Sequence, residues 1–327
     1  MRKLLCALLL SFMAAAFAAS ALPVRAQSDF PSRPIRLVVP FPAGGGIDIT
    51  ARAAAHELGS ILGQQIVVQN QGGAGGALAT DAVVKADPDG YTLLYHSTTG
   101  IVHAAVTDKL PYDWMRDLLP VAIVTRFAPV MVASPTLPSK NLKDFIALLK
   151  ANPGKYSFAS SGQGTAVHLA AELFRQKAGV DMVHVPYRGT VAAMPDLLAG
   201  RIAMMVDGVP VQTPNIRQGT ILALAVTTDK RSPAIPDVPT MKEMGVDVEV
   251  PFWTAIYAPA RTPKPVVEKL QAAIARTMRE DGVIKRLADV GTESVGSSSA
   301  ELDALTRQQF DLYRGIVRAN PALLPQQ

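Results

Sequence analysis

From Pro34 onward, short apolar runs alternate with segments whose apolar residues recur at helical spacing. In the first part of the chain this pattern predicts strands at 35–39, 65–69 and 91–95 and helices at 47–62 and 77–85. Alternation of strands and helices is typical of a mainly parallel β-sheet with helices on both faces. It therefore constrains the chain to the α/β class more strongly than any single motif does.

A second alternating set begins near Val121. It predicts strands at 121–124, 130–132, 157–159, 182–185, 202–206 and 221–226, and helices at 142–149, 165–178 and 192–199. After a proline-rich stretch come the segment 253–257, a helix begun by Pro263 and Pro265, and a last helix at 301–318. Two such sets and a late return of the chain predict two lobes around a cleft. We expect lobe 1 to comprise 27–126 and 252–327, and lobe 2 to comprise 127–251.

Residues 1–26 have the pattern of a cleavable export signal. Arg2 and Lys3 precede an apolar stretch over 4–21, and small residues lead up to a cleavage point after Ala26. We therefore expect a periplasmic protein whose signal peptide is removed near Ala26. The single cysteine, Cys6, belongs to the signal, so disulfides and thiolate metal sites are excluded from the mature chain.

Composition and charge narrow the class of function. Hydrophobic residues make up 49% and charged residues 18% of the chain, which excludes a disordered protein. Removal of the signal lowers the formal net charge from +5 to +2. No concentrated basic stripe remains, so a dedicated nucleic-acid binder is excluded.

Two glycine-rich loops connect a predicted strand to a predicted helix. They are Gly44-Gly45-Gly46, followed by Asp48, and Gly72-Gly73-Ala74-Gly75-Gly76. Glycines permit positive φ and leave peptide amides bare at a helix start, where they form a cradle for an anion. The alternative is a plain flexible turn in which Asp48 merely complements the helix dipole. Neither loop is a nucleotide signature, because no GxxxxGK[ST] or complete GxGxxG is present.

Two loops of the second set are also candidates. The segment 160–165, Ser-Ser-Gly-Gln-Gly-Thr, offers hydroxyls and amides to a ligand, or else caps a helix through Ser161 or Thr165. Arg188 either pairs with a carboxylate or is a solvated surface residue. Asp207 either faces the cleft or caps a turn. The histidines lack metal-ligand spacing and no GxSxG elbow occurs, so we expect neither a metal site nor a catalytic centre.

An ordered series of short motifs resembles a known family. It includes Arg33-Pro34-Ile35, Pro88-Asp89-Gly90-Tyr91-Thr92, Asn152-Pro153-Gly154, His184-Val185-Pro186-Tyr187-Arg188-Gly189 and Pro236-Asp237-Val238-Pro239-Thr240. These motifs and the glycine loops resemble the Bug family, the TctC-like periplasmic solute-binding proteins of tripartite tricarboxylate transporters. The resemblance extends across nearly the whole mature chain.

The resemblance implies a two-lobed Venus-flytrap fold, with a mainly parallel sheet and flanking helices in each lobe, that captures a small organic carboxylate. It implies delivery of the ligand to a membrane permease of the tripartite type, no cofactor and no metal, and we expect a monomer. The implied ligand-binding residues are Phe41, Ala43, Gly44, Gly45, Gly46, Asp48, Gly75, Gly76 and Ala77 in lobe 1, and Ser160, Ser161, Gly162, Thr165, His168, Tyr187, Arg188, Gly189 and Asp207 in lobe 2.

Three matters stay open at the level of sequence. The segment 95–104 lacks the asparagine-proline signature often found there in the family, and whether it lines the pocket is undecided. A ligand-binding sensory module for a signalling ectodomain would have the same site. A secreted hydrolase with Ser160 or Ser161 as nucleophile is the weaker alternative, because no acid partner is evident.

Overall fold

The computed structural model describes residues 30–321, so the predicted signal peptide over 1–26 and Cys6 lie outside the described residues. The chain divides into two units, Met1–Ser32 and Arg33–Gln327. Every helix and strand discussed below belongs to the second unit, which contains two β-sheets.

The first sheet has six strands in the order β11-β4-β10-β3-β1-β2. The strands are β1 (Ile35–Val39), β2 (Ile66–Asn70), β3 (Thr92–Ser97), β4 (Leu118–Phe127), β10 (Phe252–Pro259) and β11 (Thr292–Ser294). β1 pairs in parallel with both β2 and β3, whereas β10 runs antiparallel to β3 and β4. The segment 253–257 thus belongs to β10, which is inserted between two strands from much earlier in the chain.

The second sheet has five strands in the order β7-β6-β8-β5-β9. They are β5 (Pro129–Ala133), β6 (Ser157–Ser160), β7 (Val183–Pro186), β8 (Met204–Gly208) and β9 (Leu222–Val226). β6 pairs in parallel with β7 and β8, and β5 runs antiparallel to β8 and β9.

The two-sheet α/β architecture agrees with the sequence expectation, but both sheets are mixed rather than purely parallel. The strand–helix–strand units give the parallel pairs, as expected. Three strands run against the others: β5 in the second sheet, and β10 and β11 in the first. β5 and β10 lie where the chain crosses from one sheet to the other, since β4 leads through Ala128 into β5 and Pro251 leads into β10.

Local sequence signals set most helix ends. α2 (Gly46–Leu62) ends at Gly63, whose φ of 71° suits glycine. Asn141 caps α6 (Leu142–Lys150), as predicted, by accepting a hydrogen bond of 2.9 Å from the Asp144 amide. The helices that complete the two layers are α3 (Ala77–Val84), α4 (Thr98–Val106), α7 (Ala166–Ala178), α8 (Met194–Leu198), α9 (Val209–Arg217), α10 (Lys264–Thr277), α11 (Asp281–Asp289) and α12 (Ser299–Ala319), with the short helix α5 (Trp114–Asp117) and the 3-10 turns η2 (Ala74–Gly76) and η3 (Thr190–Ala193).

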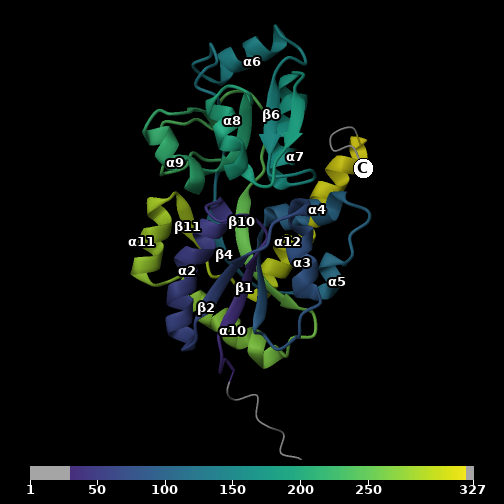
Figure 1. The fold of residues 1–327 in the computed structure, drawn as a ribbon, viewed down its shortest axis with the longest axis vertical. Helices are drawn as coiled ribbons and strands as arrows, with labels where there is room; N and C mark the ends of the chain where they lie inside the picture. Colours follow the sequence, from purple (N-terminus) through teal and green to yellow (C-terminus); the bar gives the residue numbers. More distant parts are fainter. Residues whose placement is uncertain (1–29, 322–327) are drawn as a thin grey trace, which may run out of the picture. The chain divides into compact units, whose positions relative to one another are not determined.

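The helices cover the sheets through their apolar faces. Val266, Leu270 and Ile274 of α10 and Met278 at its C-terminal cap recur at every fourth residue, and each of these side chains is at most 5% exposed. Figure 1 shows α10 and α2 beside the strands of the first sheet and α12 running alongside α4. Among residues 30–321, none of the helices combines the length and the apolar character that crossing a membrane requires.

Candidate functional site

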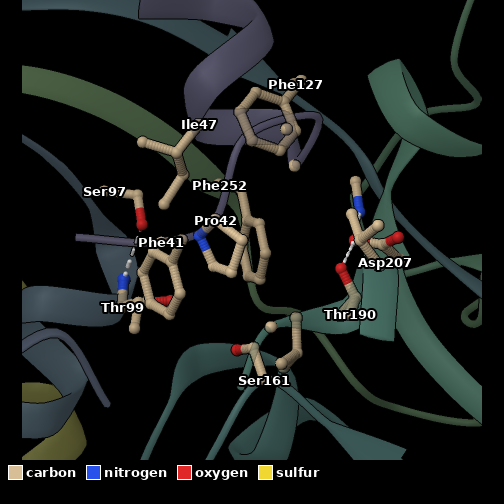
Figure 2. A pocket seen from close by; sticks show the side chains of 16 residues that line it. Phe41, Pro42, Ile47, Ser97, Thr99, Phe127, Ser161, Thr190, Asp207 and Phe252 are labelled. Atoms are coloured by element: carbon tan, nitrogen blue, oxygen red, sulfur yellow. Dashed lines mark hydrogen bonds between the residues drawn. The ribbon is translucent and has the colours of Figure 1, made fainter. Parts of the chain in front are cut away.

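A pocket lies where the carboxyl ends of the parallel strands of both sheets meet. β1 and β3 of the first sheet and β6, β7 and β8 of the second all lead into its wall. In open α/β sheets, ligands bind beyond the carboxyl ends of the strands. The lining residues, whose side chains Figure 2 shows, are Phe41, Pro42, Gly45, Gly46, Ile47, Ser97, Thr99, Phe127, Ser161, Val167, Gly189, Thr190, Val191, Asp207, Gly208 and Phe252.

Several helices begin at this pocket. Gly45 caps α2, Ser97 caps α4 and Gly208 caps α9, and all three residues line it. Val167, in the first turn of α7, lines it as well. The first N–H groups of a helix lack intrahelical acceptors and carry the positive end of the helix dipole, so this arrangement favours an anion.

The α2 and α9 termini differ in how many of their amides are already bonded. At α2, the Gly44 amide donates to Asp48 at 2.9 Å and the Gly45 amide donates to the Pro42 carbonyl at 3.4 Å, so the donors left to a ligand are the Gly46 and Ile47 amides of the first turn. At α9, the Gly208 amide donates to Oδ1 of Asp207 at 2.8 Å and the Val209 amide donates to the Ala128 carbonyl at 3.0 Å. Pro210 has no N–H to offer. The α2 end therefore provides the freer donors.

Asp48 organises the loop before α2. The buried Asp48 carboxylate accepts a hydrogen bond from the Gly44 amide at 2.9 Å and others from Arg52 and Asn70. Asn70 also donates to the Phe41 carbonyl at 2.9 Å, which ties β2 to the same loop. Burial opposes ionisation, but the hydrogen bonds from Arg52, the Gly44 amide and Asn70 outweigh it and lower the pKa of Asp48. Asp48 does not line the pocket, so its role is to hold the loop in shape.

Asp207 is an acid in the pocket wall itself. It is 4% exposed, and its carboxyl accepts hydrogen bonds from Thr190 at 2.8 Å, from Gln212 at 2.7 Å and from the Gly208 amide. Burial raises the pKa of Asp207, and these three hydrogen bonds only partly oppose the rise. In Figure 2 the Asp207–Thr190 pair lies on the side of the pocket away from Ser97 and Thr99.

Apolar side chains form most of the remaining wall. The rings of Phe127 and Phe252 meet edge to face with centroids 5.8 Å apart, and Phe41, Ile47 and Val191 extend this surface. Among the described residues that line the pocket, none carries a positively charged side chain. Helix termini and hydroxyls therefore provide the attraction for an anion.

The pocket is small. Its volume of about 50 Å³ is well below the ~300–1,000 Å³ common for ligand pockets. Access for a metabolite therefore requires the walls contributed by the two sheets to separate.

Six of the eighteen sequence-predicted ligand residues line the pocket: Phe41, Gly45, Gly46, Ser161, Gly189 and Asp207. Gly44, Ala43 and Asp48 belong to the same loop as the first three but do not line the cavity. The structure therefore brings together residues from three of the predicted loops and Asp207 at the end of β8.

The second glycine-rich loop of the first sheet lies against protein instead. A side chain on Gly75 would place its Cβ 2.8 Å from His103, and one on Gly76 would place its Cβ 2.8 Å from Nε2 of His96. Ala77 is the first residue of α3 and is buried. Gly75, Gly76 and Ala77 thus pack beside the pocket without lining it.

Most of the 160–165 loop is hydrogen-bonded to His184 of β7 and His168 of α7 or caps α7. Ser160 is fully buried, and its Oγ lies 2.7 Å from Nε2 of His184. The Gly164 amide donates to Nδ1 of His168, whose ring stacks on that of His184 at 3.8 Å. Thr165 caps α7, and Gly162 accepts a hydrogen bond from it. Within this loop Ser161 is the residue that reaches the pocket.

Tyr187 and Arg188 do not line the pocket either. The Tyr187 hydroxyl donates to Asp196, and Arg188 is exposed. The structure thus places the Arg188 side chain in solvent, which was the alternative considered from the sequence.

Sequence reasoning missed several lining residues. Ser97 and Thr99 lie in the segment 95–104, whose contribution to the pocket was open, and both line it. Their position in the sequence could have indicated this role, because they closely follow the predicted strand at 91–95. Phe127 and Phe252 come from β4 and β10, where the chain crosses between the sheets, and nothing local in the sequence marks that crossing. The other residues missed are Pro42, Ile47, Val167, Thr190, Val191 and Gly208.

A metal centre is not supported by the described part of the chain. Within residues 30–321, no group of three or more His, Cys, Asp or Glu side chains is arranged to hold a metal ion.

Comparisons with known proteins identify relatives along the whole chain. Residues 50–320 match the family model described as the tripartite tricarboxylate transporter family receptor. Protein BugT of Bordetella pertussis is 36% identical over 312 residues, which are 94% of this chain and 95% of that protein. The solved structure of the periplasmic binding protein BugD has a TM-score of 0.86 at 34% identity, covering 91% of this chain and 100% of that one. The structure of MatC from Rhodopseudomonas palustris with bound malate has a TM-score of 0.84 at 32% identity, covering 88% and 100%.

Proposed function

This chain belongs to the tripartite tricarboxylate transporter receptor family, and we propose that it captures a small organic carboxylate in the pocket between its two sheets. The family and its structural neighbours are solute-binding proteins. One such neighbour holds malate, a carboxylate. The proposed role here is that of a receptor that binds an anion and performs no reaction on it.

The convergence of helix N-termini on one pocket is the observation that carries this proposal. α2, α4 and α9 each contribute their cap residue to the wall, and the α2 cap is a glycine without a side-chain bond. Bare amides bind a carboxylate without a full positive charge. Such binding lets the receptor hold its ligand and still release it.

We extend the proposal to the protein's place in transport. The receptor works outside the cytoplasm after cleavage near Ala26, as a monomer, and delivers its ligand to a two-component permease of the tripartite type. Its ligand lies between lobe 1 (27–126 and 252–327) and lobe 2 (127–251). The strands of the two sheets divide along these ranges except at Phe127, the last residue of β4.

The surroundings of the two candidate serines support a role without catalysis. Ser160 lies beside His184, but it is fully buried and its hydroxyl also donates to the Gly162 carbonyl at 3.0 Å. The His184 ring stacks on His168 instead of being oriented by a carboxylate. Ser161 reaches the pocket, yet no hydrogen bond joins it to a histidine among the described residues.

We further propose that the pocket closes around the ligand. In the structure the 160–165 loop of the second sheet already contacts the second glycine-rich loop of the first: a Cβ on Gly162 would lie 3.7 Å from Cα of Gly75. The ligand shifts the open–closed equilibrium through contacts that exist only in the closed form. Small-angle scattering at saturating ligand should show a smaller radius of gyration, and an unchanged radius would contradict closure.

Ligand binding by the purified protein is the direct test. We expect organic carboxylates to raise the melting temperature in a thermal-shift screen and to give saturable heats in calorimetry. Sugars and inorganic cations serve as the control panel and should have no effect. Stabilisation by a sugar or a cation alone would overturn the assignment. Loss of uptake of the identified ligand on deletion of the gene would distinguish transport from sensing.

A further inference from the structure

We propose, building on the carboxylate-binding function above, that Asp207 restricts this receptor to monocarboxylates with a compact apolar body. The ligand carboxylate lies at the α2 end of the pocket. The apolar body of the ligand faces Phe127 and Phe252, which form the phenylalanine wall. Asp207 excludes a second carboxylate from the far side.

The distribution of hydrogen-bond donors orients the ligand. At the α2 end, the Gly44 and Gly45 amides donate to Asp48 and to the Pro42 carbonyl, which leaves the Gly46 and Ile47 amides in the pocket wall for a ligand. Around Asp207, the Gly208 amide, the Thr190 hydroxyl and the Gln212 amide all donate to the Asp207 carboxyl already. A ligand carboxylate therefore finds free amides at the first place and a resident acid at the second.

Charge reinforces this orientation. Asp207 is 4% exposed, and no positively charged side chain is present among the described residues of the pocket wall to neutralise it. A second ligand carboxylate beside Asp207 would bring two like charges together in a poorly solvated space, so one of them would have to take up a proton. A methyl or aromatic C–H at the same place carries no such cost.

The wall chemistry fits an apolar body. Phe127 and Phe252 pack edge to face, and Ile47 and Val191 continue their surface into a pocket of about 50 Å³. Burial of apolar ligand area against these side chains stabilises the complex, whereas carboxylate oxygens there would lose their water without gaining donors. The MatC neighbour holds malate, a dicarboxylate, so this inference separates the present chain from that relative.

Matched ligand pairs test the proposal on the wild-type protein. Terephthalate is benzoate with a second carboxylate, and succinate is butanoate with its methyl group replaced by a carboxylate. We expect calorimetry at neutral pH to show at least tenfold tighter binding of benzoate or butanoate than of its dicarboxylate partner.

Asp207→Asn isolates the side chain responsible. It keeps the size of the side chain and removes the acid, so the preference for each monocarboxylate over its dicarboxylate partner should fall at least fivefold. Asp237→Asn makes the same change of net charge at an exposed residue outside the pocket wall and should leave all four affinities unchanged. A purely structural role for Asp207 would instead weaken all four ligands together.

The outcomes separate this inference from the function on which it rests. Equal or tighter binding of the dicarboxylates to the wild type would overturn the monocarboxylate proposal and leave the receptor function standing. This comparison needs no variant, so it holds even where Asp207→Asn does not fold. If none of the four acids and no other carboxylate bound, the receptor function and the present inference would both fail.

Discussion

Gly44–Gly46 follows β1 and Gly72–Gly76 follows β2, and each loop leads its strand toward a helix of the first sheet. Around the first loop there is space: a Cβ on Gly44 would meet nothing within 4 Å, and one on Gly45 would meet only the Pro42 carbonyl at 3.5 Å. In the second loop, Gly73, Gly75 and Gly76 have no such space, although Gly72 does. A Cβ on Gly73 would lie 2.6 Å from Leu78, and one on Gly76 would lie 2.8 Å from the His96 ring.

The difference shows that similar glycine runs serve two purposes. In the first loop the absence of side chains leaves amides bare at the start of α2, and Gly45 and Gly46 line the pocket. In the second loop the absence of side chains lets His96 and His103 pack directly on the backbone. The proposed role of the first run is therefore binding, and that of the second is stability.

Gly76→Ala should give the largest effect on stability. Gly76 has a φ of 100°, and its new Cβ would lie 2.8 Å from Nε2 of His96 and 3.2 Å from Pro40. Backbone strain and overpacking together should lower the free energy of unfolding by about 3 kcal/mol. Urea denaturation of the variant beside the wild type measures this. A loss below ~1 kcal/mol would show that the ring moves aside and that the second loop is not closely packed.

As the pH is lowered, the second glycine loop, which packs on His96, should lose stability at a higher pH than the first loop, which depends on Asp48. Burial and the nearby His103 lower the pKa of His96 to about 3, and the hydrogen bond from the Ser97 amide opposes them only in part. Between pH 6.5 and 3 the unfolded chain therefore binds a proton at this position that the folded chain does not, so stability falls as pH falls. From pH 7 to pH 5 this histidine should account for a loss of about 2 kcal/mol.

His96→Gln tests this pH dependence. Unfolding free energies measured from pH 7 to pH 5 should depend less on pH in this variant, although its stability at pH 7 is lower. His56→Gln removes an exposed histidine and is the matched control, whose pH profile should follow the wild type. Asp48, whose pKa is lowered, keeps its charge over this range, so the first loop contributes stability that is lost only at still lower pH. Parallel profiles for wild type and His96→Gln would refute the assignment.

Gly44→Ala separates backbone strain from packing. The residue has a φ of 81°, as unfavourable for alanine as that of Gly76, but no atom lies within 4 Å of its new Cβ. The expected loss of stability is therefore about 1 kcal/mol, from the left-handed backbone alone. Denaturation under the conditions used for Gly76→Ala measures it, and a loss equal to that of Gly76→Ala would remove the contrast between the loops.

The fold could be predicted from the sequence to a large extent because its signals are local. The strand at 35–39 and the caps at Asn141 and Thr165 each depend on neighbouring residues. α9 was missed because Pro210 and Pro214 interrupt its pattern, and β11 was missed because it has three residues. The antiparallel position of β10 was missed because it depends on pairing with strands more than a hundred residues earlier.

The site was less accessible from the sequence for the same reason. A strand–loop–helix motif locates a helix start such as Gly45, and that signal is local. Whether a start faces a cavity or another segment depends on distant partners, as His96 beside Gly76 illustrates. The phenylalanine wall combines Phe127 and Phe252, which are 125 positions apart in the sequence. Composition and periodicity carry no information about that meeting.

Gly46→Ala should change stability least and still impair binding. Gly46 is the first residue of α2, and its new Cβ would lie 3.5 Å from Val211 and 3.9 Å from Phe127, both ordinary contacts. The gain in helix propensity and the added contacts leave the free energy of unfolding within about 0.5 kcal/mol of the wild type. The methyl group nevertheless enters the wall of a pocket of about 50 Å³ beside the bare amides. We expect roughly tenfold weaker binding of the carboxylate, a cost of about 1.4 kcal/mol, by calorimetry. Unchanged affinity would mean that the ligand does not approach the α2 start, and the distinction between a binding loop and a packing loop would no longer hold.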